Sequence, residues 1–392
     1  MTSKERFRIA MQGGTPDRVP VMCQLAVGHY FLYSGIDPLE IWYTSEGFSE
    51  ALIKMQQQYD FDGILVNLSG RQPNWRDKID KIEEKPDGEK WIYWKNGNFT
   101  KFPKDDNPHY YMGDGSRYFP TFDEIDPEKL YYIDPWNLTE ISYPFTWDFE
   151  EFERPRENFF PPYIHDTLKK VIEKVGDEIS VHAEIFSPFS QFLELLNYEN
   201  ALMALLDDPD KSHACLKNLT KGAIELGISA AKEGADAILI SSAFAGSGFI
   251  SRDNYEEFVL PYEKELISAI KAEIDIPVFT HTCGGIGDRL DLMMESGLNG
   301  IDTLDPPPLG TVELEEAMLE TRGKIFIKGN IDAVNTLLLG NEETVQSAVK
   351  NRLHVAKDGG GYICSTACSI APSTKPSMIE HMVKITHKFG KY

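Results

Sequence analysis

Short apolar runs rich in β-branched residues recur along the chain, and segments with helical periodicity separate most of them. Eight of these runs predict strands: Val19–Gln24, Gly63–Asn67, Ile179–Glu184, Ala237–Ser241, Ile276–His281, Gly300–Leu304, Lys324–Lys328 and Gly361–Ser365. Amphipathic segments between them predict helices, among them Asp210–Glu233, Tyr255–Ile274, Gly287–Ser296 and Glu342–Lys357. Near-continuous apolar strands that alternate with helices indicate a parallel sheet covered by helices. Eight such units favour an α/β fold of the (β/α)8 TIM-barrel type, with a doubly wound sheet as the alternative.

Residues from about 70 to 162 break this alternation with many aromatic, proline and charged positions. Within them, Asp87–Phe102 predicts a β-hairpin whose turn is Asn96-Gly97. We therefore predict a single barrel domain over residues 1–392, with a capping segment inserted after the second strand at about 70–162. This insertion is interpreted either as a structural cap or as a substrate lid or docking surface, and both interpretations stay open.

Composition narrows the classes of partner. The formal net charge is −23 over 392 residues, which argues against nucleic acid because phosphate binding needs a basic face. No apolar run approaches the roughly 18 residues of a membrane span, and the first residues lack the apolar core of a signal peptide. We therefore expect a cytoplasmic protein without a membrane partner. Five cysteines are an odd number for a disulfide framework, so clustered cysteines suggest metal binding or reactivity.

The run from Phe279 to Gly285 carries the most informative chemistry. Its His281 and Cys283 are two residues apart on an extended segment, so both side chains point to the same side. The pair lies at the C-terminal end of a predicted strand, the end where barrel active sites gather, and Cys368 follows the last predicted strand. One imidazole and two thiolates form a zinc-type ligand set with an open fourth position, which is typical of catalytic zinc. Taken alone, an His-x-Cys pair is also consistent with ordinary packing.

Other candidates are weaker. Cys364 competes with Cys368 but lies inside a predicted strand, which favours core packing, as for Cys23 and Cys215. Glu184 ends the third strand and is interpreted as a fourth oxygen ligand, as a carboxylate that orients His281, or as an ordinary polar residue. Together with Glu184, Asp332 is predicted to be catalytic, and Asp302 and Asp305 are further candidates to line the pocket. The glycine-rich runs at 246–248 and 284–287 lack phosphate-loop spacing and predict tight turns.

Several longer stretches carry a family resemblance. They are Ile250-Ser251, Tyr255–Phe258, Pro261-Tyr262, His281–Gly284, Lys328–Asp332 and Cys368–Pro376. These stretches resemble the uroporphyrinogen decarboxylase superfamily, which implies a (β/α)8 barrel. Decarboxylases of this superfamily carry an N-terminal Arg-Gln-Ala-Gly-Arg-Tyr run, whereas the corresponding Met22–Tyr30 lacks both arginines. The other branch, similar to methylcobamide:coenzyme M methyltransferases, holds zinc through His-x-Cys and a distant cysteine, and His281, Cys283 and Cys368 match that pattern.

The resemblance implies a zinc-dependent methyltransferase. Its methyl group would move between a corrinoid, methylcobalamin, carried by a corrinoid-binding partner protein and a small substrate. That substrate is expected to be a thiol acceptor or a methoxylated or methylated donor. Two alternatives stay open: a metal-free decarboxylase acting on a smaller acid, and a non-catalytic adaptor for a corrinoid protein with a structural zinc.

Overall fold

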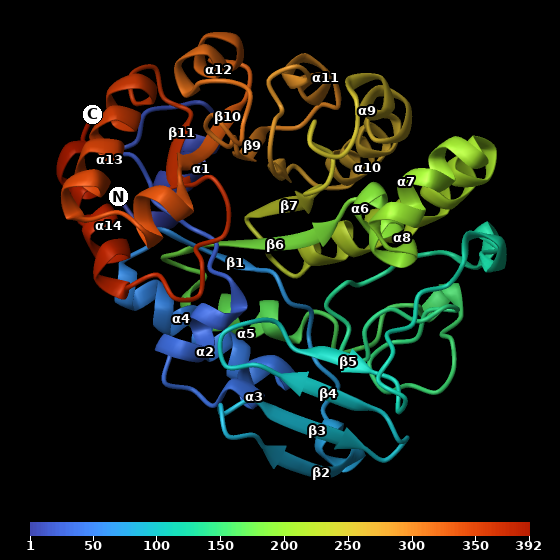
Figure 1. The fold of residues 1–392 in the computed structure, drawn as a ribbon. Coiled ribbons are helices and arrows are strands. Elements are labelled where there is room, and N and C mark those ends of the chain that lie inside the picture. Colours follow the sequence, from blue (N-terminus) through green and yellow to red (C-terminus); the bar gives the residue numbers. More distant parts are fainter.

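A curled parallel sheet of seven strands forms the centre of the molecule in the computed structural model, which describes residues 1–392 (Figure 1). Its strands are β1 (Gly63–Val66), β6 (Ser180–Phe186), β7 (Ala237–Ser241), β8 (Val278–Thr282), β9 (Gly300–Thr303), β10 (Phe326–Ile331) and β11 (Tyr362–Thr366). All neighbouring strands are parallel, and their order across the sheet follows their order in the chain. A doubly wound sheet reverses its strand order at one point, so that alternative is wrong.

Seven of the eight predicted strands are confirmed, and the prediction of a strand at Val19–Gln24 is wrong. This segment is extended but makes only isolated bridges to β11 and beyond, at Val21–Cys364 and Leu25–Ile370. Pro20 has no N–H to donate, so a regular ladder cannot form through it. The segment nevertheless lies between the two edges of the sheet. Pro20 accepts a hydrogen bond from the Cys364 amide at 2.9 Å, and Val21 accepts one from the Asp62 amide, just before β1, at 2.8 Å.

Helices surround the sheet (Figure 1). They are α1 (Ser3–Met11), α2 (Val27–Tyr33), α3 (Pro38–Tyr43), α4 (Ser45–Tyr59), α5 (Asp166–Val175), α6 (Pro188–Leu196), α7 (Tyr198–Asp207), α8 (Pro209–Lys232), α9 (Arg252–Phe258), α10 (Leu260–Glu273), α11 (Leu290–Glu295), α12 (Leu314–Thr321), α13 (Glu342–Ala356) and α14 (Pro376–Phe389). A π-helical turn follows β10 at Ala333–Leu338. None of these helices has the length and apolarity to cross a membrane.

The predicted helices at Asp210–Glu233 and Glu342–Lys357 are confirmed as α8 and α13. The predicted helix Tyr255–Ile274 is interrupted at Val259, which separates α9 from α10. Pro261 explains the break, because proline lacks the amide donor and restricts the residue before it. The predicted helix Gly287–Ser296 begins later, at the start of α11, since the Gly287 amide donates instead to the Thr311 hydroxyl at 3.0 Å.

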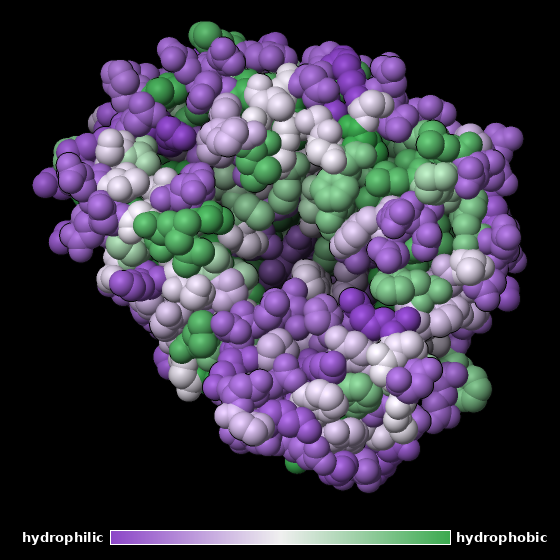
Figure 2. Space-filling model, viewed as in Figure 1, coloured by the Kyte–Doolittle hydropathy of each residue, from purple (hydrophilic) through white to green (hydrophobic).

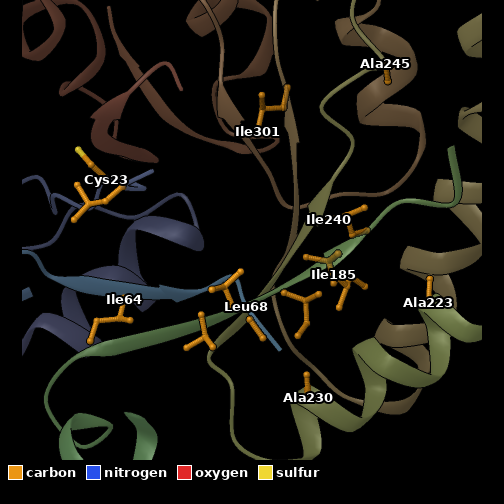
Figure 3. Close-up of a cluster of buried hydrophobic side chains, with 14 of the residues drawn as sticks. Cys23, Ile64, Leu68, Ile185, Ala223, Ala230, Ile240, Ala245 and Ile301 are labelled. Atoms are coloured by element: carbon orange, nitrogen blue, oxygen red, sulfur yellow. The ribbon is translucent and has the colours of Figure 1, made fainter. Parts of the chain in front are cut away.

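Both faces of the sheet are apolar, which explains the continuous hydrophobic strands. On the outer face, Ile185 of β6 and Ile240 of β7 lie close to Ala223 and Ala230 of α8 in the main core (Figure 3). The inner face forms a second cluster, with Phe7 from α1 packed among strand residues. These strand residues include Leu65, Leu239, Phe279 and Phe326. Side chains alternate along a strand, so the residues two positions after them point to the same inner side.

Residues 67–179 contain a second, antiparallel sheet. Its strands are β2 (Ile79–Glu84), β3 (Lys90–Trp94), β4 (Phe99–Phe102) and β5 (His109–Tyr111), paired in chain order. The predicted hairpin is confirmed: β3 and β4 pair, and Gly97 adopts a φ of 88° in the turn between them. One face of this sheet packs on α2 and α3, through Phe102 against Phe31 and Trp94 against Tyr43. It forms a distinct layer in the lower part of Figure 1.

Candidate metal centre

The last residues of β8 place His281 and Cys283 at the carboxyl end of the sheet, where all parallel strands end. His281 lies two residues after the inward-facing Phe279 and is buried. The Sγ atom of Cys283 lies 3.3 Å from Nε2 of His281. The expectation that the two side chains share one side is therefore met by the structure.

The segment after β11 brings the third candidate to the same place. The Sγ atom of Cys368 lies 3.7 Å from that of Cys283, and the three ligand atoms of His281, Cys283 and Cys368 all lie within 4.8 Å of one another. Cys364 lies within β11 and points elsewhere, with its sulfur 3.3 Å from the Thr386 hydroxyl of α14. The fold thus brings together Cys368, rather than Cys364, with the His281–Cys283 pair.

Two glycines allow the loops around Cys283 to approach each other. A Cβ atom on Gly246 would lie 2.2 Å from the Cys283 carbonyl oxygen, so only glycine fits there. Gly284 has a φ of 78°, which favours glycine, and its amide donates to Oδ2 of Asp305 at 2.6 Å. The glycine-rich runs at these positions are therefore tight turns that shape the site.

Electrostatics within the cluster favour a thiolate. A hydrogen bond between the two sulfurs lowers the pKa of Cys368 and raises that of Cys283, so one of the two thiols loses its proton readily. Burial opposes charge on His281, but hydrogen bonds to Asp302 and Cys368 outweigh it and raise the pKa of His281 to about 10. Without a metal, a proton on the imidazole balances the thiolate. A cation would take the place of that proton.

The separations of Cys283 from the two other ligand atoms fit a tetrahedral ion. Bond lengths of about 2.3 Å to sulfur and about 2.0 Å to nitrogen give tetrahedral edges of about 3.8 Å between sulfurs and about 3.5 Å between sulfur and nitrogen. The separations of 3.7 Å and 3.3 Å are close to these values. The side chains of Cys283 and Cys368 are partly exposed, so one side of the set stays open to a fourth ligand.

Asp302 of β9 is the carboxylate that contacts the cluster, a role that the sequence did not assign to it. Its Oδ2 lies 3.1 Å from Nδ1 of His281, and its Oδ1 accepts a hydrogen bond from Nζ of Lys328 on β10 at 2.7 Å. Burial alone would raise the pKa of Asp302, but the Lys328 charge and His281 lower it to about 2. A signal was present in the sequence, because Asp302 and Lys328 are opposite charges inside two adjacent apolar strands.

Glu184 of β6 lies at the same end of the sheet. It follows His182 by two positions, and His182 packs on the inner residues Phe7 and Phe279, so Glu184 also faces inward. Its Oε2 has no hydrogen-bond partner, and burial raises the pKa of Glu184 to about 7. A carboxyl group with an uncommitted oxygen therefore faces the interior that contains His281.

Asp305 and Asp332 have local partners. Burial raises the pKa of Asp305 to about 6, and its Oδ2 accepts a hydrogen bond from the Gly284 amide. Asp332 caps the π-helical turn, with Oδ1 accepting from the amides of Val334 and Asn335 at 2.9 and 2.7 Å. Its Oδ2 accepts from the Asn335 side chain, so both oxygens of Asp332 are engaged.

The surface has a hollow over the curled sheet and a cavity beside the antiparallel sheet. Figure 2 shows a hollow near the centre of the face drawn, over the curled sheet, with hydrophilic residues in its depth and hydrophobic residues beside it. A separate cavity of about 750 Å³ lies between the antiparallel sheet and the loop at 139–151. The walls of that cavity do not include His281, Cys283 or Cys368, so this cavity is separate from the candidate metal centre.

Comparison with known proteins identifies the family of this chain. The chain matches the uroporphyrinogen decarboxylase (URO-D) family over residues 139–389, well over half its length. The chain belongs to this family. Relatives named for two different activities are similar to it. The methylcobamide:CoM methyltransferase MtbA of Methanosarcina acetivorans is 29% identical over 236 residues, which cover 58% of this chain and 63% of that protein. The uroporphyrinogen decarboxylase of Vesicomyosocius okutanii is 26% identical over 235 residues, covering 58% and 65%.

The chain thus spans less than two thirds of the length of these relatives. A solved structure, a methyltransferase from Methanosarcina mazei, superposes over 99% of both chains with a TM-score of 0.71 at 17% sequence identity. This likeness supports the URO-D-type fold. The comparisons support enzymes of the methyltransferase and decarboxylase kinds at the level of the family.

Proposed function

We propose that this protein is a zinc-dependent methyltransferase that moves a methyl group between the corrinoid of a partner protein and a small substrate. The observation that carries the proposal is the convergence of His281, Cys283 and Cys368 within 4.8 Å at the carboxyl end of the sheet, with one side open. Three protein ligands and an open position are typical of catalytic zinc. The similarity to methylcobamide:CoM methyltransferases supports the choice of reaction.

The proposal includes a complete (β/α)8 TIM barrel formed by residues 1–392 as one domain. In this interpretation the extended segment at 19–25 takes the place of the eighth strand, since it hydrogen-bonds to β11 and to the residue before β1. Residues of about 70–162 then form a segment that caps the substrate site. Corrinoid-binding protein and small molecule would both approach the carboxyl end, because barrel active sites lie there.

The chain's own residues have distinct roles in the proposal. His281, Cys283 and Cys368 hold zinc; a bound zinc ion favours the thiolate form of a thiol and polarises the leaving atom of a methylated donor. Glu184, whose pKa is raised to about 7 by burial, can give or take the substrate's proton near neutral pH. Asp332 acts by fixing the loop after β10 through its capping hydrogen bonds.

With a thiol acceptor, the methyl group would move from the partner's corrinoid to the sulfur of the thiol. The thiol would give its proton to Glu184 or to solvent, and its sulfur would then take the methyl group from the partner's methylated corrinoid, which would keep the electron pair of the broken bond. The protein supplies orientation and shields the reaction from water. For a methylated donor the direction would reverse: this chain would bind and orient the donor, and the partner's reduced corrinoid would be the methyl acceptor.

Metal analysis combined with a methyl-transfer assay tests the proposal. The purified protein is expected to contain about one zinc per chain, and methylated donors and thiols are screened against a corrinoid whose absorbance reports methylation. Chelation of zinc, His281→Ala and Cys283→Ala should each abolish transfer, whereas Cys215→Ala, which removes a distant buried thiol, should not. Transfer that survives chelation would refute the proposal.

Two other outcomes would identify the rival functions. Release of carbon dioxide from a small acid by protein free of zinc would indicate a decarboxylase; the missing arginines at Met22–Tyr30 argue against this outcome. A zinc ion whose absorption-edge spectrum does not change when a thiol is added would indicate a permanent fourth protein ligand. That result would favour a non-catalytic adaptor for the corrinoid protein.

A further inference from the structure

A row of three polar side chains begins at the candidate ligand His281 and crosses three adjacent strands. The strand register places His281 of β8 opposite Asp302 of β9, and Asp302 opposite Lys328 of β10. All three side chains are buried, with exposed fractions of 8%, 2% and 2%. Charged residues in the interior of a sheet are costly unless each one is paired.

The pairing in this row is specific. Nζ of Lys328 makes its hydrogen bond to Oδ1 of Asp302 at 2.7 Å, and it has no other side-chain or backbone acceptor. The second oxygen, Oδ2, lies 3.1 Å from Nδ1 of His281. One carboxylate therefore connects the lysine to the ring nitrogen that does not face the cysteines.

We propose that Lys328 is a positioning residue for metal binding. It holds the Asp302 carboxylate in one orientation, and Asp302 in turn keeps a proton on Nδ1 of His281 and directs Nε2 toward the metal site beside Cys283. Hydrogen bonds of this kind to the second nitrogen of a ligand histidine fix the ring and strengthen metal binding. This inference rests on the proposed function, because it assumes that His281 binds a metal.

Charge balance gives Lys328 a second reason to be there. Two thiolates balance a divalent cation, so an ionised Asp302 would leave the buried cluster with one excess negative charge. The ammonium group of Lys328 compensates that charge at 2.7 Å. An apolar side chain at this position would leave Asp302 buried without its cation, free to turn away from His281.

The test compares zinc dissociation constants measured by competition with a chromophoric chelator. Lys328→Met keeps most of the length of the side chain and removes its charge, and we expect it to weaken zinc binding about 10- to 100-fold. Asp302→Asn should weaken it by a similar factor. Because Lys328 acts through Asp302, the double variant should bind zinc no more than about threefold more weakly than Asp302→Asn alone.

Two further variants serve as controls. Lys328→Gln retains a donor for Asp302 and should recover most of the affinity, which also covers the case in which Lys328→Met does not fold. Lys264→Met removes a half-exposed lysine of α10 that pairs with Glu295 at 2.9 Å, and it should leave zinc affinity unchanged. Circular dichroism and thermal unfolding of each metal-free variant separate loss of folding from loss of affinity.

A second readout does not depend on zinc. Nitrogen-15 NMR of the metal-free protein should show that the imidazole of His281 loses its ordered Nδ1–H hydrogen bond in Lys328→Met but not in Lys264→Met. Unchanged zinc affinity in Lys328→Met, or multiplying effects in the double variant, would overturn the positioning role while the proposed function stands. A wild-type protein that binds no zinc would overturn the proposed function, and the NMR comparison would still decide whether Lys328 orients His281.

Discussion

The two ends of the parallel sheet hold two polar clusters that look alike in composition and differ in how completely they are satisfied. At the amino end, Asp62 precedes β1 and accepts hydrogen bonds from Ser3, Arg6, Arg18 and the amide of Val21 at 2.6–2.9 Å. Both of its oxygens are engaged. At the carboxyl end, His281, Cys283 and Cys368 converge with an open side, and Oε2 of Glu184 has no partner.

The difference separates a structural cluster from a candidate binding site. Buried polar groups that are fully hydrogen-bonded hold the fold together, whereas buried groups without partners call for a ligand, an ion or water. The amino end ties α1 and the extended segment at 19–25 to the sheet. The carboxyl end holds three side chains able to bind a metal ion and a Glu184 carboxyl oxygen without a hydrogen-bond partner. Mutations at the two ends should therefore affect different measurements.

The largest effect on stability is expected from Asp62→Ala. This change removes the buried carboxylate that pairs with Arg6 and Arg18 and leaves both guanidinium groups without that partner. Breaking a buried ion pair in this way costs about 3–5 kcal/mol of unfolding free energy. Urea unfolding of the metal-free protein should show the loss as a lower midpoint. The zinc affinity of the fraction that remains folded should stay at the wild-type value; a parallel loss of affinity would show that the two ends are coupled.

A smaller effect, and one that depends on pH, is expected for Glu263→Gln near the carboxyl end. Burial raises the pKa of Glu263 to about 7, the Tyr255 hydroxyl donates to its Oε2 at 3.3 Å, and its Oε1 has no partner. The folded state therefore holds this proton more tightly than the unfolded state. The stabilisation is complete below pH of about 4.5 and is lost as the pH rises to about 7, a change of roughly 3 kcal/mol.

Glutamine cannot lose that proton, so the Glu263→Gln variant should lack this part of the pH dependence and be more stable than the wild type at pH 8. Unfolding free energies measured at intervals from pH 4.5 to pH 8 check the prediction. Glu273→Gln, which changes an exposed carboxylate at the end of the same helix, should follow the wild-type curve. Identical curves for wild type and Glu263→Gln would contradict the burial argument.

Zinc should stabilise the carboxyl end by a comparable but slightly smaller amount. A ligand at 100 times its dissociation constant that binds only the folded state adds about 2.7 kcal/mol to the unfolding free energy. Thermal unfolding should therefore shift upward with zinc in the wild type and in Cys364→Ser. Cys364→Ser should keep the shift because Cys364 faces Thr386 instead of the cluster. The shift should disappear in Cys368→Ser, because this change removes one of the three candidate ligands. A shift that survives in Cys368→Ser would exclude this cysteine as a ligand.

The same two ends show what the sequence could predict. Periodicity located seven strands, and the positions of His281, Cys283 and Cys368 at or just after the carboxyl ends of strands placed all three at one end of the sheet. The prediction from periodicity failed at Val19–Gln24. The hydrophobic pattern there suggests a strand, but it takes no account of Pro20, which lacks the amide donor that a regular ladder needs. The same pattern predicted one helix where the structure has two, α9 and α10, which are separated at Val259 close to Pro261.

The polar partners of the site were harder to predict. Which carboxylate reaches His281 depends on strand order and register. Asp302 is opposite His281 on the adjacent strand β9, whereas Glu184 is on β6, two strands away from β8. Register is set by tertiary packing and is not visible in one strand's pattern. The capping role of Asp332 was equally hidden, since the π-helical turn that it caps has no clear signal in the sequence. Spacing identified the ligands, but only the fold identified what surrounds them.

The smallest effect is expected at the exposed edge of the amino-end cluster, from Asp17→Asn. Asp17 bonds to the same Arg6 as Asp62, at 2.7 Å, but 47% of its side chain is exposed, compared with 1% for Asp62. Water can replace a partner at that position, so the free energy of unfolding should fall by no more than about 1 kcal/mol. Urea unfolding of Asp17→Asn beside Asp62→Ala measures the contrast at one shared arginine. Equal losses would mean that the number of ion pairs, and not the burial of the carboxylate, determines the stability of this end.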